Sequence, residues 1–228
     1  CCRSGTYVPT RPDSADIDGP EQQNPWSMKH RDERMGAFDA VMYGIEGDPL
    51  LRSPIIAFVL LDGTPEVRAV ADRTEYVTRL FPRLRQRAVG SPFSPAPPRW
   101  EPDPNFDPDY HVRWRRLPGE PDVHAALDYA ARMAEQDFDR QRPLWEIAVL
   151  TDLVDDQSAV VIKIHHSIAD GMGGLEMSAA LFDLVPDPPQ PEPLDAPPLP
   201  AASGAVDRAR QAAAFEAGAL REVVTGSV

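Results

Sequence analysis

Cysteine is almost absent from this 228-residue chain, which contains only Cys1 and Cys2. Two adjacent cysteines can supply neither a disulfide framework nor a set of zinc ligands. Free thiols are typical of proteins that work in a reducing compartment. Residues 1–5 also lack the apolar segment of a secretory signal peptide. We therefore expect a cytoplasmic location.

Long apolar runs and an excess of basic charge are missing as well. The longest apolar run, residues 54–61, is too short to span a bilayer. Basic residues number 23 against 36 acidic ones, which gives a formal net charge of −13. Such a balance argues against nucleic acid as a partner and against electrostatic adsorption to anionic lipid. Peripheral contact with a membrane or with lipid inclusions that does not depend on charge is still possible.

Proline is abundant, with 26 residues, and it marks the organisation of the chain. Residues 1–34 are polar and rich in turn formers, so we expect them to be disordered or laid on the surface. Residues 35–185 carry the apolar patterns of a folded domain. Residues 186–203 are proline-rich and predict an extended linker. Residues 204–228 predict a helix that leads to a C-terminal domain missing from this chain.

Apolar periodicity predicts strands and helices within the folded domain. Residues 55–61 form a continuous apolar run, which predicts a buried strand. Residues 146–150 and 159–165 flank a polar turn at 155–158 and predict an antiparallel hairpin. Asp122 is placed to cap a helix. Alternation over residues 83–89 predicts a half-exposed strand whose arginines face solvent.

One stretch, residues 165–171 with the sequence His-His-Ser-Ile-Ala-Asp-Gly, ends the second strand of this hairpin. A strand end holds an imidazole in a fixed orientation, and imidazole can both take up and release a proton near neutral pH. Alternation directs His165 and His166 to opposite sides, without indicating which one faces substrate. Asp170 can fold back to bind a cation, and Gly171 leaves the backbone open to a substrate. A helix should begin near Gly174.

Other chemistries are weakly supported by the residues. Two histidines with an aspartate could hold a metal, but His30, His111 and His124 lie in unrelated segments and no His-Glu-x-x-His occurs. We therefore expect no metal ligands. The absence of Gly-x-Ser-x-Gly argues against a serine hydrolase. A non-catalytic binding domain remains an alternative.

The pattern His-His-x-x-x-Asp-Gly resembles the signature of the coenzyme A-dependent acyltransferase superfamily. Four further blocks resemble its bacterial wax ester synthase/diacylglycerol acyltransferase family, and the resemblance covers about residues 36–185. These blocks are residues 38–46, residues 82–87, residues 103–112, and Arg142-Pro143-Leu144-Trp145-Glu146. The resemblance implies the N-terminal half of such a protein. The implied fold is α/β (α+β), a two-layer sandwich of the chloramphenicol acetyltransferase-like type, with a mixed, largely antiparallel sheet packed with helices.

The resemblance also implies an activity: transfer of a fatty acyl group from acyl-coenzyme A to diacylglycerol or to a long-chain alcohol. By analogy His166 is the general base, His165 supports it, and Asp170 holds the turn through a salt bridge. Gly171 and the Pro143-Leu144-Trp145 block are assigned to substrate binding. No bound cofactor is implied, because acyl-coenzyme A acts as a co-substrate.

Several points stay open from the sequence. The family's second half, with its Asn-Asp motif, is absent, so the implied partner is a C-terminal half of the same protein, expected as a separate chain. The alternatives are another coenzyme A-dependent acyltransferase, a condensation-type enzyme and a non-catalytic half-domain. The acceptor alcohol, the acyl chain length and the oligomeric state are not indicated.

Overall fold

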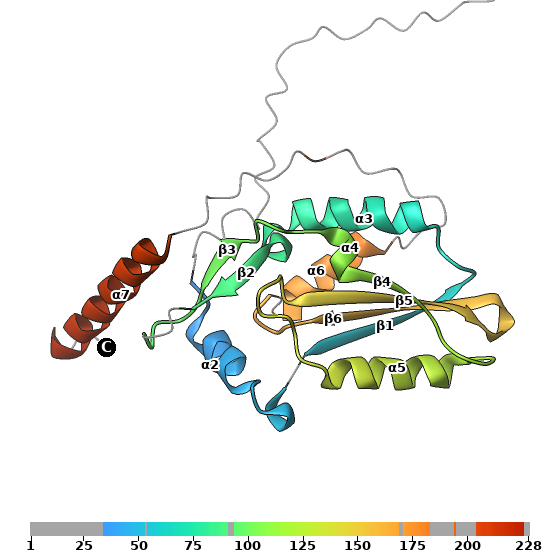
Figure 1. Ribbon diagram of the computed structural model, residues 1–228, viewed down its shortest axis with the longest axis horizontal. Helices are drawn as coiled ribbons and strands as arrows, with labels where there is room; N and C mark the ends of the chain where they lie inside the picture. The colour runs from blue at the N-terminus through green and yellow to red at the C-terminus, as the bar shows by residue number, and fades with distance from the viewer. Residues whose placement is uncertain are drawn as a thin grey trace, which may run out of the picture. The chain divides into compact units, whose positions relative to one another are not determined.

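A four-stranded sheet in the order β1-β6-β5-β4 lies at the centre of the chain (Figure 1). The computed structural model describes residues 34–52, 54–90, 94–168, 171–182, 194 and 204–225. The strands are Ile55–Asp62 (β1), Val112–Arg116 (β4), Trp145–Leu153 (β5) and Gln157–Ile164 (β6). Strand β6 runs antiparallel to both β1 and β5, whereas β4 runs parallel to β5. The predicted mixed, largely antiparallel sheet is confirmed.

Strands β5 and β6 form the predicted hairpin, joined by the short 3₁₀ turn η3 (Val154–Asp156). Asp155 and Asp156 adopt positive φ angles of 59° and 56°. Aspartate tolerates this left-handed region better than most residues, because its short polar side chain can bond locally. Strand β6 begins at Gln157, inside the predicted turn, since this residue pairs with Asp62 on one side and Leu153 on the other.

Helix α5 (Val123–Glu135) covers one face of the sheet (Figure 1). The Asp122 side chain accepts a hydrogen bond from the backbone N–H of Ala125 at 3.0 Å, so the predicted cap is confirmed. Small residues of α5 pack on alternate residues of β5 and β6. The buried cluster comprises Ala126, Ala130, Met133, Ala148, Leu150, Leu153, Ala159 and Val161.

Three helices lie on the opposite side of the sheet from α5: α3 (Val67–Leu80), α4 (Pro108–His111) and α6 (Gly171–Leu181) (Figure 1). Beside them a small hairpin joins β2 (Gln86–Val89) to β3 (Arg99–Pro102). The residues of β5 and β6 that alternate with the α5-facing set are also buried. They are Ile147, Val149, Val160 and Ile162.

The strand predicted over residues 83–89 begins only at Gln86, because Pro82 opens a 3₁₀ turn, η2 (Pro82–Arg85). Its arginines do not form a solvated face, which corrects the prediction. Arg83 is only 8% exposed and lies 4.5 Å from the centre of the Trp100 ring. Arg85 pairs with Glu75 at 2.7 Å. Alternation gave no sign that distant side chains would cover these cations.

Helix α2 (Ala37–Ile45) and the 3₁₀ turn η1 (Pro49–Leu51) precede β1, and helix α7 (Ala205–Thr225) confirms the helix predicted near the end of the chain. Arg34 donates a hydrogen bond to the Gln211 carbonyl of α7 at 2.8 Å. Residues 1–33, and all of 183–203 except Leu194, fall outside the described residues, and with them the predicted disordered segment and linker. The further domain after α7 stays a prediction. In the described part of the chain, no helix is long and apolar enough to cross a membrane.

Candidate active site

The two histidines of the motif emerge from the middle of the sheet. The last residue of β6, Ile164, pairs with Ile55 of β1 and with Trp145 of β5. The next residue, His165, donates its backbone N–H to the Leu144 carbonyl at 3.0 Å. The chain is therefore fixed on both sides at the point where the motif begins, as expected for a strand end.

His165 is completely buried. Its Nδ1 accepts hydrogen bonds from the Ser167 backbone N–H at 3.0 Å and from the Ser167 hydroxyl at 2.7 Å. Because a backbone N–H can only donate, Nδ1 carries no proton and the neutral ring is protonated on Nε2. Nε2 lies 3.0 Å from Oε2 of Glu46, an ion-pair distance whose angle falls outside that of a hydrogen bond. The supporting role of His165 stays a prediction.

Burial, reinforced by the positive charge of Arg140, lowers the pKa of His165 from 6.5 to about 4. The ring is therefore neutral at physiological pH. A buried imidazole that cannot be charged near pH 7 is a poor proton carrier, because proton uptake requires the charged form. His165 is thus suited to hold its neighbours rather than to carry a proton.

This shift predicts a pH-dependent stability. Below the ordinary pKa of 6.5 the unfolded chain binds a proton at His165, whereas the folded chain does so only near pH 4. Stability is therefore full above 6.5 and falls on acidification between these values, by about 1.4 kcal/mol per pH unit for one histidine. Burial also lowers the pKa of His111, which adds to the loss.

Urea unfolding at about pH 7.5 and about pH 5.5 would measure this loss, since most carboxylates stay ionised in that window. His165→Gln should be less stable at the higher pH but should lose less on acidification. Equal losses in both proteins would contradict the assignment of the slope to His165.

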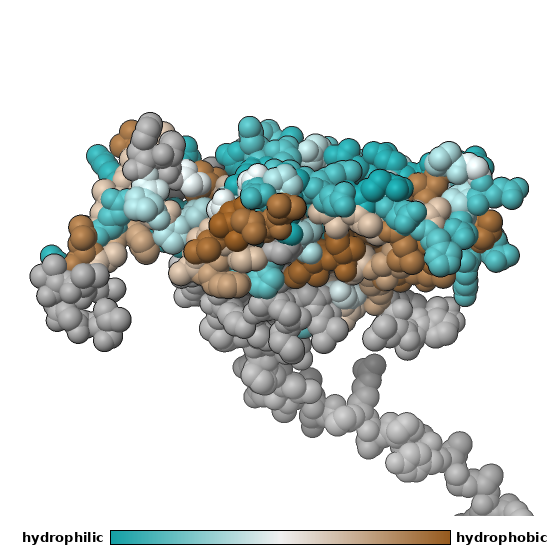
Figure 2. Space-filling model, turned by 90° about the horizontal axis from the view of Figure 1, so that it is seen from below, coloured by the Kyte–Doolittle hydropathy of each residue, from teal (hydrophilic) through white to brown (hydrophobic). Residues whose placement is uncertain are grey.

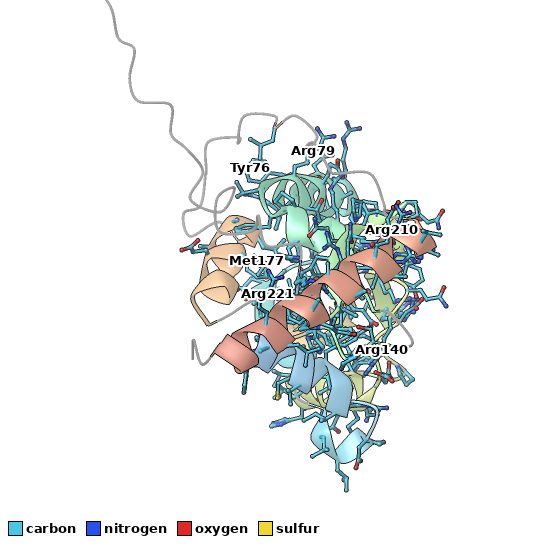
Figure 3. The ribbon with its side chains drawn as sticks, turned by 90° about the vertical axis from the view of Figure 1, so that its left-hand side faces the viewer. Tyr76, Arg79, Arg140, Met177, Arg210 and Arg221 are labelled. Atoms are coloured by element: carbon cyan, nitrogen blue, oxygen red, sulfur yellow. The ribbon has the colours of Figure 1, made fainter. Side chains whose placement is uncertain are left out.

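The surroundings of His165 combine aromatic rings with two cations, one of them completely buried. Tyr43 and Phe138 both meet the imidazole edge-on, with ring centroids 5.7 and 5.9 Å away. Arg140, labelled in Figure 3, lies 4.4 Å from the centre of the Tyr43 ring. Lys163, also completely buried, lies 4.2 Å from the Phe138 ring and donates to a backbone carbonyl at 2.7 Å. Each ring thus contacts both the imidazole and a cation, and burial lowers the pKa of Lys163.

His166, in contrast, reaches solvent, with 40% of its side chain exposed. Its Nδ1 lies 3.3 Å from Oδ1 of Asp39 on helix α2, and Phe38 of the same helix meets the ring edge-on at 6.0 Å. Within the described part of the chain, Nε2 has no hydrogen-bond partner. The structure thus answers what alternation left open: His165 packs inside and His166 faces outward.

The family model of the wax ester synthase/diacylglycerol acyltransferase catalytic domain matches residues 35–228. The chain belongs to this family. A "Putative diacylglycerol O-acyltransferase" of Mycobacterium tuberculosis (strain H37Rv) is 38% identical over 168 residues, which are 74% of this chain and 34% of the relative. A "Probable diacylglycerol O-acyltransferase" of the same strain is 37% identical over 116 residues, which are 50% and 24% of the two chains. The chain spans about a third or less of these relatives.

Solved structures support the fold. The first condensation domain of the CDA synthetase has a TM-score of 0.51 at 17% identity, covering 65% of this chain and 38% of that one. The starter condensation domain of the rhizomide synthetase in complex with C8-CoA has a TM-score of 0.53 at 18% identity, covering 68% and 35%. A wax ester synthase/diacylglycerol acyltransferase from Marinobacter aquaeolei VT8 reaches 0.49 at 22% identity, covering 64% and 37%. The likeness to the two condensation domains confirms the predicted fold class.

The second part of the family motif is only partly visible. Asp170 lies outside the described residues, so its predicted salt bridge stays a prediction. Helix α6 begins at Gly171, three residues earlier than predicted, so the motif's glycine opens the helix. Its predicted contact with substrate also stays a prediction. Among the described residues, no group of three or more His, Cys, Asp or Glu side chains is placed to hold a metal ion.

The family's Pro143-Leu144-Trp145 block lies at the start of β5. All three residues are buried: Leu144 is completely buried and Trp145 is 3% exposed. The Leu144 carbonyl binds the His165 N–H, and the indole N–H of Trp145 donates to the Leu84 carbonyl at 2.8 Å. The block therefore supports the strand end that carries the histidines. Its predicted role in substrate binding remains a prediction.

Three polar residues of the site were missed as such by sequence reasoning: Asp39, Glu46 and Ser167. The first two lay in a block that resembled the family, but they were read as part of core packing. Their spacing of seven residues, two helical turns, was an available signal that both acids share one face of a helix. Ser167 offers no comparable signal, because only the turn after β6 brings its hydroxyl to the His165 ring.

Proposed function

We propose that the protein containing this chain is an O-acyltransferase that moves a fatty acyl group from acyl-coenzyme A to diacylglycerol or to a long-chain alcohol. The observation that carries the proposal is His166: a solvent-accessible imidazole with Nδ1 beside a carboxylate and Nε2 without a partner among the described residues. A general base needs such an accessible lone pair within reach of the proton that it removes. Membership of the family supplies the reaction class.

In the proposed reaction, Nε2 of His166 takes the proton of the acceptor hydroxyl. The acceptor oxygen bonds to the thioester carbonyl carbon, and the bond from that carbon to sulfur then breaks. His166 returns its proton to the thiolate of coenzyme A, so the base ends as it began. No covalent acyl-enzyme and no bound cofactor are required. The neutral, buried His165 fixes the chain beside the base without competing for the proton.

A C-terminal half of the same protein, as a separate chain, is proposed to complete the site. The chain spans 34% of its relative from M. tuberculosis, and apolar side chains of α2 and η1 are exposed. Phe38 is 67% exposed, Val41 60% and Leu50 91%. Figure 2 shows hydrophobic residues in patches beside a hydrophilic band on one face of the molecule. Apolar patches of this kind are favoured sites of association.

A cytoplasmic location with peripheral contact to a membrane or lipid inclusions is also part of the proposal. Both proposed acceptors and both products are apolar molecules that collect in lipid, so the enzyme must meet them at a lipid surface. The formal net charge of −13 does not favour adsorption to anionic lipid by charge, and the exposed apolar side chains would carry such contact.

The test is an acyl-transfer assay on the natural protein at full length. Radiolabelled acyl-coenzyme A is incubated with diacylglycerol, with a long-chain alcohol or without acceptor, and the lipids are separated by thin-layer chromatography. We expect acceptor-dependent triacylglycerol or wax ester, and little product from residues 1–228 alone. Free fatty acid as the only product would indicate a thioesterase. Formation of an amide with an amine acceptor would indicate a condensation-type enzyme. Either result would refute the proposal.

A further inference from the structure

Helix α2 and the residue that follows it, Glu46, bring two carboxylates to the two motif histidines. Asp39 and Glu46 are seven residues apart, so they lie on the same side of the helix axis. Oδ1 of Asp39 is 3.3 Å from Nδ1 of His166, and Oε2 of Glu46 is 3.0 Å from Nε2 of His165. One element far from the motif in sequence therefore contacts a ring nitrogen of each histidine.

We propose that Asp39 is a positioning residue that holds His166 in the tautomer protonated on Nδ1, so that Nε2 carries the lone pair of the base. This inference rests on the proposed role of His166 in acyl transfer. Asp39 does not touch substrate in this proposal. It acts through the orientation and the tautomer of the imidazole.

The chemistry of the two groups supports this assignment. A neutral imidazole has one N–H, and a carboxylate can only accept a hydrogen bond. The Nδ1 that faces Asp39 must therefore be the donor, because the other tautomer would set a lone pair against a negative oxygen. The distance of 3.3 Å is long, as hydrogen bonds of a free active site often are before substrate binds. When Nε2 takes a proton, the same carboxylate stabilises the resulting cation.

The neighbouring histidine provides an internal contrast. Ser167 donates to Nδ1 of His165, so that ring is protonated on Nε2, the opposite arrangement. The two adjacent histidines are thus held in opposite tautomers. Nδ1 of His166 faces Asp39 of α2, whereas Nε2 of His165 lies 3.0 Å from Glu46, the residue after α2, at an angle outside that of a hydrogen bond. Their exposure differs as well: His165 is enclosed, whereas 40% of the His166 side chain and 31% of the Asp39 side chain are exposed. Of the two pairs, the His166 pair is therefore the one that a ligand can reach.

Nitrogen NMR of ¹⁵N-histidine-labelled protein tests the tautomer directly, because protonated and unprotonated ring nitrogens have well-separated shifts. His166→Gln identifies the His166 signals by their loss. We expect Nδ1–H at His166 in the unaltered protein, and a shift of the population toward Nε2–H in Asp39→Ala. The His165 signals should keep their Nε2–H pattern in both proteins.

Kinetics on the full-length protein provide the second measurement. Asp39→Ala should lower kcat by roughly ten- to a hundred-fold, with KM for acyl-coenzyme A nearly unchanged. We expect a smaller effect than the about 10⁴-fold loss of kcat that follows a change of the buried aspartate in a Ser-His-Asp triad. Water can take over part of the role of an exposed carboxylate such as Asp39. Added formate should restore part of the rate, because the site is open to solvent. In a His166→Ala background, Asp39→Ala should cause no further loss.

Asp72→Ala is the matched control, since Asp72 is a 73% exposed carboxylate on α3 that pairs with Arg68 at 3.6 Å. It should leave both the tautomers and kcat unchanged. The inference is overturned if His166 is already Nε2–H in the unaltered protein. It is also overturned if Asp39→Ala folds and changes neither the tautomer nor kcat. The proposed function itself would fail separately, through near-normal turnover of His166→Ala.

Discussion

His166→Ala should lower the rate of acyl transfer by about a hundred- to ten-thousand-fold, the usual effect of losing a general base. The fold should survive, because 40% of the His166 side chain is exposed and its hydrogen bond to Asp39 is long. Initial rates with saturating acyl-coenzyme A and acceptor, on the full-length protein, would measure the loss. An unchanged melting temperature would show that the loss of rate arises in the chemical step and not from unfolding.

Two other histidines provide the comparisons for this variant. His124 is exposed on helix α5, so His124→Ala should change neither rate nor stability. His165→Ala should act differently from His166→Ala, because it removes a completely buried ring together with its hydrogen bond from Ser167 and its contact with Glu46. Its main effect should be loss of stability. A folded His166→Ala protein with near-normal turnover would refute the role of His166 as the base.

The hairpin of β5 and β6 and the motif at its end could be predicted because their signals are local. Apolar alternation, a polar turn and the strand end all lie within about twenty residues, and each corresponds to an observed element. Periodicity also placed the two histidines on different sides. It could not indicate that His165 is enclosed, because that depends on Tyr43 and Phe138, which come from other elements.

The remaining parts of the site depend on contacts between distant segments. Asp39 lies 127 residues before His166, and no local pattern relates an acid of one helix to a histidine of one turn. The arginines of η2 fail for the same reason: Arg83 and Arg85 alternate like exposed residues, yet Trp100 and Glu75 cover them. Sequence periodicity reports which face of an element is apolar, whereas tertiary packing decides which charges become enclosed.

Trp145 connects three parts of the structure, and its removal should have the largest effect on stability. Its indole N–H donates to the Leu84 carbonyl of η2 at 2.8 Å. Its ring stacks on His111 of α4 at 4.3 Å, with an interplanar angle of 17°. His111 in turn donates Nδ1–H to the Trp145 carbonyl at 2.8 Å, since a carbonyl oxygen can only accept. Trp145 thus holds η2 and α4 against the start of β5.

Trp145→Ala should therefore destabilise the fold by about 3–5 kcal/mol, the range for truncating a buried tryptophan. Trp145→Phe keeps an aromatic ring next to His111 but leaves the Leu84 carbonyl without its donor, so a loss of about 1–3 kcal/mol is expected. Urea unfolding at neutral pH would measure both. Trp114→Ala, on the neighbouring strand β4, is the matched control: this half-buried tryptophan should cost clearly less.

The Trp145 variants also separate packing from the predicted contact with substrate. A residue that acts only by holding η2 and α4 should change stability, and Trp145→Phe should leave KM for acyl-coenzyme A unchanged at temperatures where the protein is folded. A higher KM in folded Trp145→Phe would instead support a substrate contact for the Pro143-Leu144-Trp145 block. A Trp145→Ala protein within about 1 kcal/mol of the unaltered one would contradict the packing argument, because so small a loss is typical of an exposed position.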